Sequence, residues 1–182
     1  MPRLFTGIEI PPAIGEALAL LRGGLPGARW TEPDSYHLTL RFIGDIDERM
    51  ADEVADRLSR VRRPAFSVAL EGLGSFGSRR PHAIVARATV PPALGELQAE
   101  LERIMQRIGL PPETRKFMPH VTLARLRGTS AEEVAEYLSL RGGFTTAAFP
   151  VDRFVLFSSR NQTGGGPYLV EDAYPLAPLE IG

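Results

Sequence analysis

The chain has 182 residues, of which 43% are hydrophobic and 24% charged, and its formal net charge is −1. These values are typical of a globular protein that can bury a core, and the length fits one domain or two small lobes. The near-neutral charge excludes a strong basic field for nucleic acid, although a few local arginines would suffice for one nucleotide end. The absence of cysteine excludes disulfide bonds, zinc–thiolate sites and a cysteine nucleophile.

The sequence carries no sign of export or of a membrane span. The N-terminus begins with an alternating strand pattern and lacks the layout of a signal peptide. No apolar run approaches the roughly 20 residues of a membrane-spanning helix. We therefore expect a cytoplasmic protein with no membrane partner. We also expect a monomer.

Hydrophobic periodicity, together with proline and glycine breaks, divides the first half of the chain into elements. Pro11 and Pro12 end the first strand and begin a helix, because proline is tolerated in the first helical turn. The predicted elements are a strand over 3–10, a helix to about residue 21, strands over 28–31 and 36–43, a helix with its apolar face over 50–61, a strand over 66–70, and a loop over 71–81 that is rich in Gly, Ser, Arg and Pro.

The pattern restarts after residue 81. A stripe of leucines and isoleucines over 94–108 is the clearest helical face in the chain, and Ser130 with Glu133 forms a capping box for a later helix. The predicted elements are a strand over 82–89, a helix over 94–108, a strand from residue 120, a helix after residue 130, a strand over 151–159, a loop over 161–166, and a last strand over 168–176 that pairs in a hairpin.

Two motifs occur twice. The segment Pro-Pro-Ala-Ile-Gly-Glu that starts at Pro11 returns with one change at Pro91, and His-Leu-Thr-Leu at His37 returns as His-Val-Thr-Leu at His120. The offsets of 80 and 83 residues indicate a duplication. We expect a single bilobal domain over 1–182, with repeat halves 1–80 and 82–160 and a final strand over 168–176. A pseudo-two-fold axis would bring the two histidines face to face.

The two histidine motifs predict paired acid–base chemistry. In a strand, side chains at i and i+2 share a face about 6.5–7 Å apart, so His37 lies beside Thr39, and His120 beside Thr122. A free imidazole titrates near pH 6.5, so two of them can act as general acid and general base in one displacement. Phosphodiester cleavage suits such a pair, with the threonine hydroxyls donating hydrogen bonds to the phosphate oxygens. No cofactor is expected, and no motif for a metal is present.

The third histidine, the glycine run and two arginine pairs are interpreted as structural or solvent-exposed rather than functional. A single His-x-Thr is usually structural, and only its return at an equivalent position reverses that view. His82 has no threonine two residues on and is interpreted as structural. The glycine run 164–166 lacks the lysine and helix of a phosphate loop. The arginine pairs at 62–63 and 79–80 are interpreted as solvated faces.

Four stretches resemble the 2H phosphoesterases, and within them the RNA 2′,3′-cyclic phosphodiesterases, also named 2′-5′ RNA ligases. They are RLFTGIEIPP from residue 3, HLTLRFIGD from residue 37, PHVTLAR from residue 119, and the segment from Ser159 to Tyr168. The resemblance implies a bilobal α+β fold with two antiparallel sheets lining a cleft. It implies metal-free opening of a 2′,3′-cyclic phosphate to a 2′-phosphate. It also implies that His37 donates the proton and His120 accepts one, with Thr39 and Thr122 on the phosphate.

Two further residues match positions that the family uses near its substrate. Arg125 lies five residues after His120, but a regular strand would turn it to the opposite face. Either the strand bends or ends there, or Arg125 is structural. Arg41 lies on the His37 face by parity and is a rival. Phe5 matches an aromatic residue that could stack on a base, and a core role is the alternative.

Three functions remain open from the sequence. The first is hydrolysis of RNA 2′,3′-cyclic phosphate ends, with weak reverse 2′-5′ ligation. The second is action on a small cyclic nucleotide such as ADP-ribose 1″,2″-cyclic phosphate. The third is a non-catalytic nucleotide-binding module, against which the intact histidines and threonines count.

Overall fold

Strands and helices alternate along the chain in the order that the periodicity predicts. The computed structural model describes residues 3–159 and 167–178. Its elements are β1 (Arg3–Glu9), α1 (Pro12–Ala19), β2 (Ala28–Trp30), the 3-10 helix η1 (Pro33–Ser35), β3 (His37–Asp45), α2 (Glu48–Leu58), β4 (Phe66–Val68), β5 (Leu70–Phe76), β6 (Ala83–Ala88), α3 (Pro92–Arg107), β7 (His120–Leu126), α4 (Ala131–Arg141), β8 (Phe149–Val151), β9 (Arg153–Ser159) and β10 (Tyr168–Pro175).

Local sequence signals fix the ends and the buried faces of the helices. Pro12 and Pro92 occupy the first turns of α1 and α3, where a missing N–H costs nothing. Ser130 and Glu133 form the predicted capping box at α4. The predicted stripe on α3 is fully buried at Leu94, Leu97 and Leu101 and partly buried at Ile104 and Ile108. Its burial anchors α3 in the main hydrophobic core.

One eight-stranded sheet spans both lobes. Its order is β10-β9-β1-β3-β7-β6-β5, with β2 added beside β7. Between β3 and β7, a single residue pair joins Leu38 to Val121. These two residues are equivalents in the sequence repeat, so the pseudo-two-fold axis passes between them. The two expected antiparallel sheets are therefore two halves of one sheet, joined at this pair.

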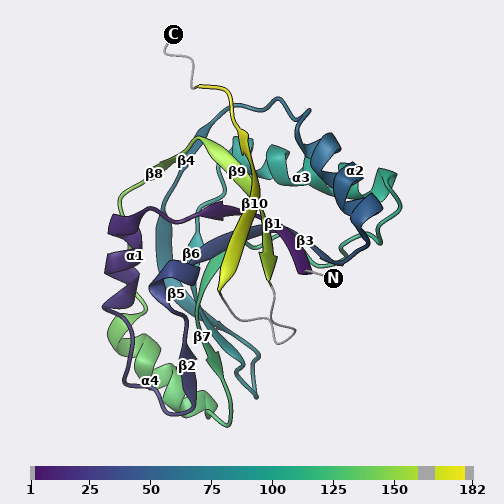
Figure 1. Cartoon of the computed structure of the whole chain (residues 1–182). Helices are drawn as coiled ribbons and strands as arrows, with labels where there is room; N and C mark the ends of the chain where they lie inside the picture. Colours follow the sequence, from purple (N-terminus) through teal and green to yellow (C-terminus); the bar gives the residue numbers. More distant parts are fainter. Residues whose placement is uncertain (1–2, 160–166, 179–182) are drawn as a thin grey trace.

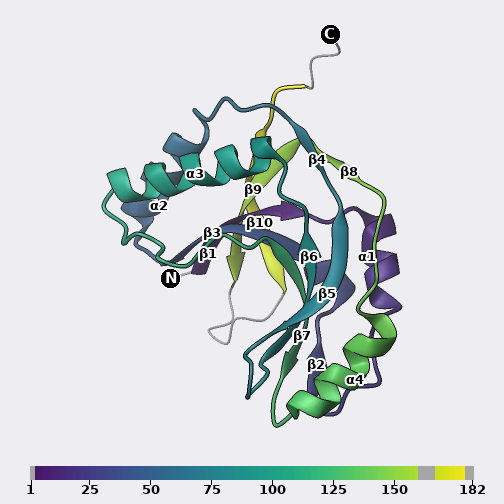
Figure 2. The ribbon, with the colours of Figure 1, turned by 180° about the vertical axis from the view of Figure 1, so that it is seen from behind.

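The halves of the chain exchange strands and helices across that axis. In the lobe of β1 and β3, the neighbouring strand is β9 from the second half, and in the lobe of β6 and β7 it is β5 from the first half. Helices α2 and α3 lie together over one lobe, while α1 and α4 line the other (Figures 1 and 2). The Tyr137 hydroxyl of α4 donates to the Leu21 carbonyl just beyond α1. Each lobe is thus built from both halves of the chain. The division into halves 1–80 and 82–160 stays a prediction.

The predicted loop over 71–81 is wrong for its first part, because β5 continues to Phe76. Gly72 has φ of +82°, and the pairing of β5 with β6 shifts register between Leu70 and Leu73, which marks a bulge. Gly74 leaves room for the guanidinium of Arg87, which a Cβ there would strike. The glycines that resemble a loop in sequence therefore serve a bulge and a close contact within a strand.

The predicted strand over 151–159 is two strands. β9 begins at Arg153, and β8 pairs with β4 in a separate two-stranded sheet. The last strand pairs with β9 as expected. The predicted loop over 161–166 lies outside the described residues.

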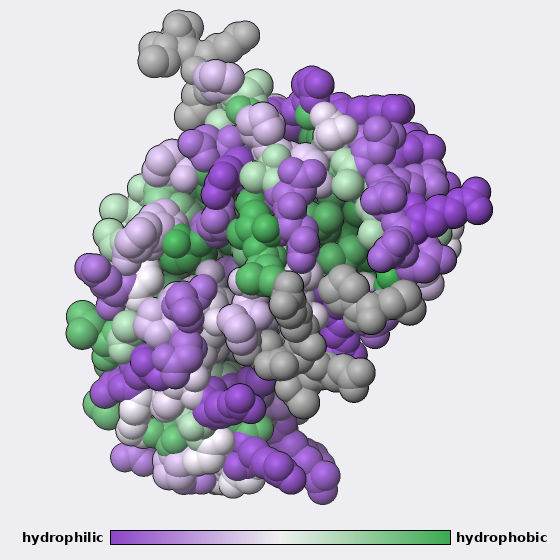
Figure 3. Space-filling model, in the orientation of Figure 1, coloured by the Kyte–Doolittle hydropathy of each residue, from purple (hydrophilic) through white to green (hydrophobic). Residues whose placement is uncertain are grey.

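Hydrophilic and apolar residues gather on different parts of the surface shown in Figure 3. Hydrophilic residues cover the side of α2 and α3, whereas apolar surface lies over the middle, where β10 runs. Leu169 and Val170 of β10 are exposed. No helix within the described ranges is long and apolar enough to cross a membrane.

Candidate active site

The two histidine strands come together at the pseudo-two-fold axis. Leu38 and Val121 pair directly and are fully buried on the back of the sheet. Because side chains alternate along a strand, the residues on either side of each point to the other face, toward a cleft of about 800 Å³. That cleft is lined by both histidines and both threonines of the repeated motifs: His37, Thr39, His120 and Thr122.

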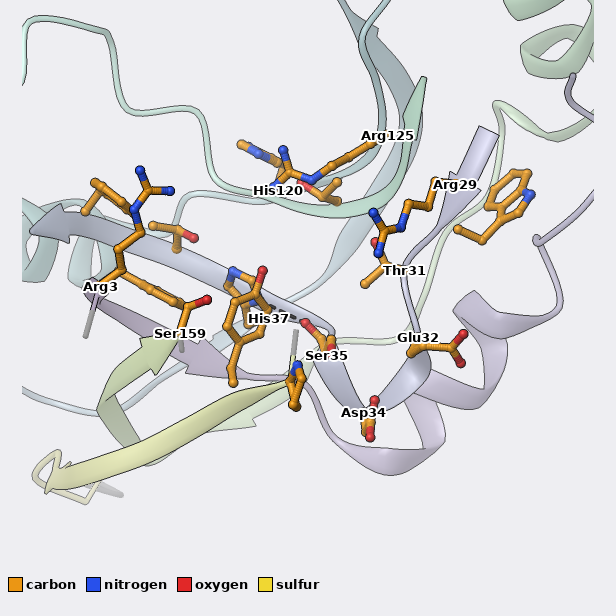
Figure 4. Close-up of a pocket in the computed structure, with 17 residues that line it drawn as sticks. Arg3, Arg29, Thr31, Glu32, Asp34, Ser35, His37, His120, Arg125 and Ser159 are labelled. Carbon is orange, nitrogen blue, oxygen red and sulfur yellow. Dashed lines mark hydrogen bonds between the residues drawn. The ribbon is translucent and has the colours of Figure 1, made fainter. Parts of the chain in front are cut away.

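Both imidazoles are held in the same way. The Nδ1 atom of His37 lies 2.9 Å from the carbonyl oxygen of Ser35, a bond drawn in Figure 4. The Nδ1 atom of His120 lies 2.7 Å from the carbonyl oxygen of Met118. A carbonyl accepts only, so Nδ1 carries the proton in each ring. In the neutral form the lone pair of each ring is therefore on Nε2.

Aromatic rings pack around His37. The rings of Tyr168 and Phe5 lie 4.8 Å and 4.9 Å from it, and that of Phe157 lies 5.7 Å away. Burial lowers the pKa of His37, and the charges of His120 and Arg125 lower it further, while the bond to Ser35 opposes them. The neutral imidazole of His37 is thus favoured.

His120 has a smaller aromatic neighbourhood on the opposite lobe. Phe76 at the end of β5 meets it edge-on, with ring centres 4.8 Å apart. Burial lowers the pKa of His120, and the hydrogen bond to the Met118 carbonyl raises it by less. The ring of His82 lies 6.2 Å from that of Phe76, and His82 is not among the residues that line the cleft.

A bulge in β7 turns Arg125 into the cleft. Val85 of β6 pairs with Thr122, and Ile84 pairs with Ala124, so Leu123 is the extra residue. Leu123 and Ala124 are both buried, and alternation resumes with Arg125 on the side of Thr122. Arg125 lines the cleft and hydrogen-bonds Tyr168 of β10. Of the alternatives for Arg125, a bend in the strand is the one found.

The same irregularity in β3 turns Arg41 away. Gly7 pairs with Thr39 and Thr6 with Arg41, so Leu40 is the extra residue. Arg41 is 7% exposed and forms an ion pair with Glu102 of α3. The prediction that Arg41 shares the face of His37 is wrong, because it assumed an unbroken alternation.

Phe42, which follows Arg41, is brought into the cleft instead and is 47% exposed. Phe5 by contrast is 4% exposed and lies against the rings of His37 and Phe157. Of these two phenylalanines, Phe42 therefore offers the open aromatic face.

Several residues that line the cleft were not predicted from the sequence. Arg3 and Ser159 lie on one side of His37, and Arg29 and Thr31 of the β2 segment lie on the other (Figure 4). Arg29 sits on a three-residue strand, which carries too little pattern to assign a face. Phe42 could have been found, because it lies five residues after His37 just as Arg125 follows His120.

Within residues 3–159 and 167–178, no group of three or more histidine or acidic side chains is placed to hold a metal ion.

Known proteins are similar to this chain in sequence and in fold. Residues 8–86 and 85–168 each match the family of LigT-like phosphoesterases. The RNA 2′,3′-cyclic phosphodiesterase of Aeropyrum pernix is 41% identical over 108 residues, which make up 58% of this chain and 60% of that protein. The protein of the same name from Aquifex aeolicus is 29% identical over 153 residues, which make up 81% of each.

A solved structure agrees with these matches. The crystal structure of E. coli LigT complexed with 3′-AMP superposes with a TM-score of 0.78 and 27% identity, covering 97% of this chain and 99% of that one. Two histidine–threonine strands facing one cleft in an α+β fold are the mark of the 2H phosphoesterases. The chain belongs to the family of LigT-like phosphoesterases within that superfamily. The predicted fold class and the prediction of an enzyme are confirmed.

Proposed function

We propose that the protein hydrolyses RNA 2′,3′-cyclic phosphate ends to 2′-phosphates without a metal ion. The observation that carries this is the pair of equivalent imidazoles, each fixed through Nδ1, beside two threonines in one cleft. The relatives from Aeropyrum pernix and Aquifex aeolicus bear the name of this activity.

The reaction divides between the two rings. His120 Nε2 takes a proton from water, whose oxygen attacks phosphorus as the bond to the ribose 3′-oxygen breaks. His37 Nε2 donates its proton to that leaving oxygen. The product carries its phosphate on the 2′-oxygen, and the reverse sequence would join a 2′-phosphorylated end to another hydroxyl in a 2′-5′ link.

Three side chains stabilise the charge that develops on the phosphate. The hydroxyls of Thr39 and Thr122 donate to its non-bridging oxygens from either side of the axis. Arg125 adds a positive charge, and its bond to Tyr168 spans the cleft between the lobes. Donors fixed in advance of the reaction are the most effective way to hold such charge.

Base stacking and a core role were the alternatives for Phe5, and here we assign base stacking to Phe42. The exposed ring of Phe42 is the platform for the terminal base, since an open π-face tolerates any base. Phe5, predicted to touch substrate, lines the cleft but is buried, and its ring packs against His37. A monomeric state and a cytoplasmic location stay predictions.

A substrate comparison tests the proposal. The purified protein is given a 2′,3′-cyclic mononucleotide, an RNA oligonucleotide with a cyclic end, and ADP-ribose 1″,2″-cyclic phosphate, each with excess EDTA. We expect the RNA end to be opened fastest, with ³¹P NMR showing a 2′-phosphate. Binding without turnover of any substrate would indicate a nucleotide-binding module. A preference for the ADP-ribose compound would assign the protein to small nucleotides.

A further inference from the structure

Two arginines lie side by side on the cleft wall. Arg29 of β2 is the direct register partner of Arg125 of β7. Directly paired residues point to the same face, with their Cβ atoms about 4.5–5.5 Å apart. Both line the cleft, and Figure 4 shows both side chains extending into it.

Among the described residues, no partner compensates the positive charge of Arg29. Like charges directly opposite each other destabilise a sheet. Within residues 3–159 and 167–178, no ion pair or hydrogen bond is formed by the guanidinium of Arg29. The nearest acidic residue along the strand, Glu32, is bound to Arg22 at 3.4 Å. Asp34 of η1 also lines the cleft and lies below Arg29 in the view of Figure 4.

We propose that Arg29 binds a second phosphate, namely the phosphodiester on the 5′ side of the terminal nucleotide. This rests on the proposed function, in which Arg125 serves the cyclic phosphate. β3 and β2 share one edge of β7: β3 pairs at Val121, and β2 pairs farther along, at Ala124–Leu126, so Arg29 lies beside Arg125, five residues along β7 from His120. The cleft volume of about 800 Å³ is near the upper end of the range of about 300–1,000 Å³ for small-molecule sites, which leaves room beyond one nucleotide. The enzyme is thereby directed to the end of an RNA chain rather than to a free cyclic nucleotide.

Two dinucleotides that end in a 2′,3′-cyclic phosphate test this. One has an ordinary phosphodiester link, and the other a neutral methylphosphonate link of the same length. We expect the wild-type protein to favour the charged link in kcat/KM by about tenfold or more, as for a lost bond to a charged group. A cyclic mononucleotide with and without a 5′-phosphate shows whether a terminal phosphate serves equally well. A gain from that phosphate with none from the charged link would overturn the proposal.

Variants of Arg29 assign the preference to this side chain. Arg29→Gln should bring the ratio between charged and neutral links to within about twofold of unity, and Arg29→Lys should retain part of it. The matched control is Arg103→Gln on the exposed face of α3, which removes one charge outside the cleft and should keep the full ratio. Thermal unfolding checks that each variant is folded, and relief of repulsion should leave Arg29→Gln at least as stable as the wild type.

The outcomes separate this inference from the proposed function. A wild-type protein that opens every cyclic end but ignores the charge of the link would overturn the second phosphate site alone. So would an unchanged ratio in Arg29→Gln. Failure of the wild-type protein to open any cyclic end would overturn the proposed function, and the site with it.

Discussion

Phe42 of β3 and Arg125 of β7 occupy the same place in the two halves of the cleft. Each lies five residues after its histidine, and each reaches the cleft because one residue bulges from its strand. The symmetric frame thus carries an aromatic ring on one side and a positive charge on the other. On the proposed function, we expect this difference to give the substrate one orientation, with its base toward Phe42 and its phosphate toward Arg125.

Loss of either histidine should abolish most of the activity. His37→Ala and His120→Ala should each lower kcat by several orders of magnitude, because each removes one of two coupled proton transfers. The double variant should be little slower than either single one, since groups that act as a unit are not additive. His82→Ala is the control and should behave as the wild type. Full activity in a folded His37→Ala protein would refute the assignment.

The pH dependence of kcat/KM follows from the two shifted histidines. Burial lowers the pKa of His37 and of His120 from the ordinary value near 6.5. The free enzyme needs one ring protonated and the other neutral, so the profile is bell-shaped with apparent pKa values that belong to the pair. We expect its maximum on the acid side of about pH 6.5. A maximum well above pH 7 would contradict the burial of the pair.

The same shifts make stability depend on pH. The folded state disfavours the imidazolium, so protonation favours unfolding. The contribution is present in full above about pH 6.5 and is lost as pH falls through the lower folded values. The free energy of unfolding should therefore decline below about pH 6.5, and less steeply in His37→Asn. Urea titrations at a series of pH values measure this.

Arg125 and Arg41 should separate activity from stability. Arg125→Gln removes a charge from the cleft and should lower kcat/KM by about 10- to 150-fold, with little change in the unfolding free energy. Arg41→Gln breaks a buried ion pair with Glu102 and should cost about 3–5 kcal/mol of stability, while the folded fraction keeps its activity. The opposite pattern would place Arg41 rather than Arg125 on the substrate.

The threonines provide a milder test. Thr39→Val and Thr122→Val each remove a hydroxyl and roughly keep the shape of the side chain. A lost hydrogen bond to a charged phosphate should lower kcat/KM by about 10- to 150-fold. Steady-state rates on a cyclic substrate measure it. If neither variant falls by more than a few-fold, the threonines only support their strands.

A sulfur substrate distinguishes the acid from the base. A 3′-thiolate leaves without a proton far more readily than an alkoxide, since a model thiol has a pKa near 8.5. A cyclic substrate with sulfur at the 3′ bridging position should therefore largely rescue His37→Ala. It should not rescue His120→Ala, which still lacks a base for water. The reverse pattern would exchange the two roles.

The sequence predicted the elements of the site, but not the faces of β3 and β7 beyond their histidine motifs. The repeated motif located His37 and His120, and the repeat itself predicted that they meet. The alternation of faces then failed beyond each threonine, because a bulge adds one residue and reverses the side chains that follow it. In β7 the adjacent apolar residues Leu123 and Ala124 interrupt the alternation and were an available signal. In β3, Leu40-Arg41-Phe42 keeps an alternating pattern and gave none.

Features that depend on distant contacts were also beyond the sequence. Gly72 and Gly74 indicate a loop when taken locally, and only the bulge and the guanidinium of Arg87 explain them within a strand. The burial of Phe5 depends on Phe157 and Tyr168, which come more than 150 residues later. Pairing of Arg29 with Arg125 depends on where a three-residue strand docks.

The exchange of strands between the halves explains why such asymmetry can exist. Neither half holds a whole lobe, since β5 completes the sheet of the second half and β9 that of the first. Two separate copies of a half-length chain, completing one another in this way, would form a homodimer in which every residue occurs twice around the axis. Covalent linkage removes that restriction. An arginine can then face the axis from one side and a phenylalanine from the other, and a symmetric scaffold can bind a molecule whose two ends differ.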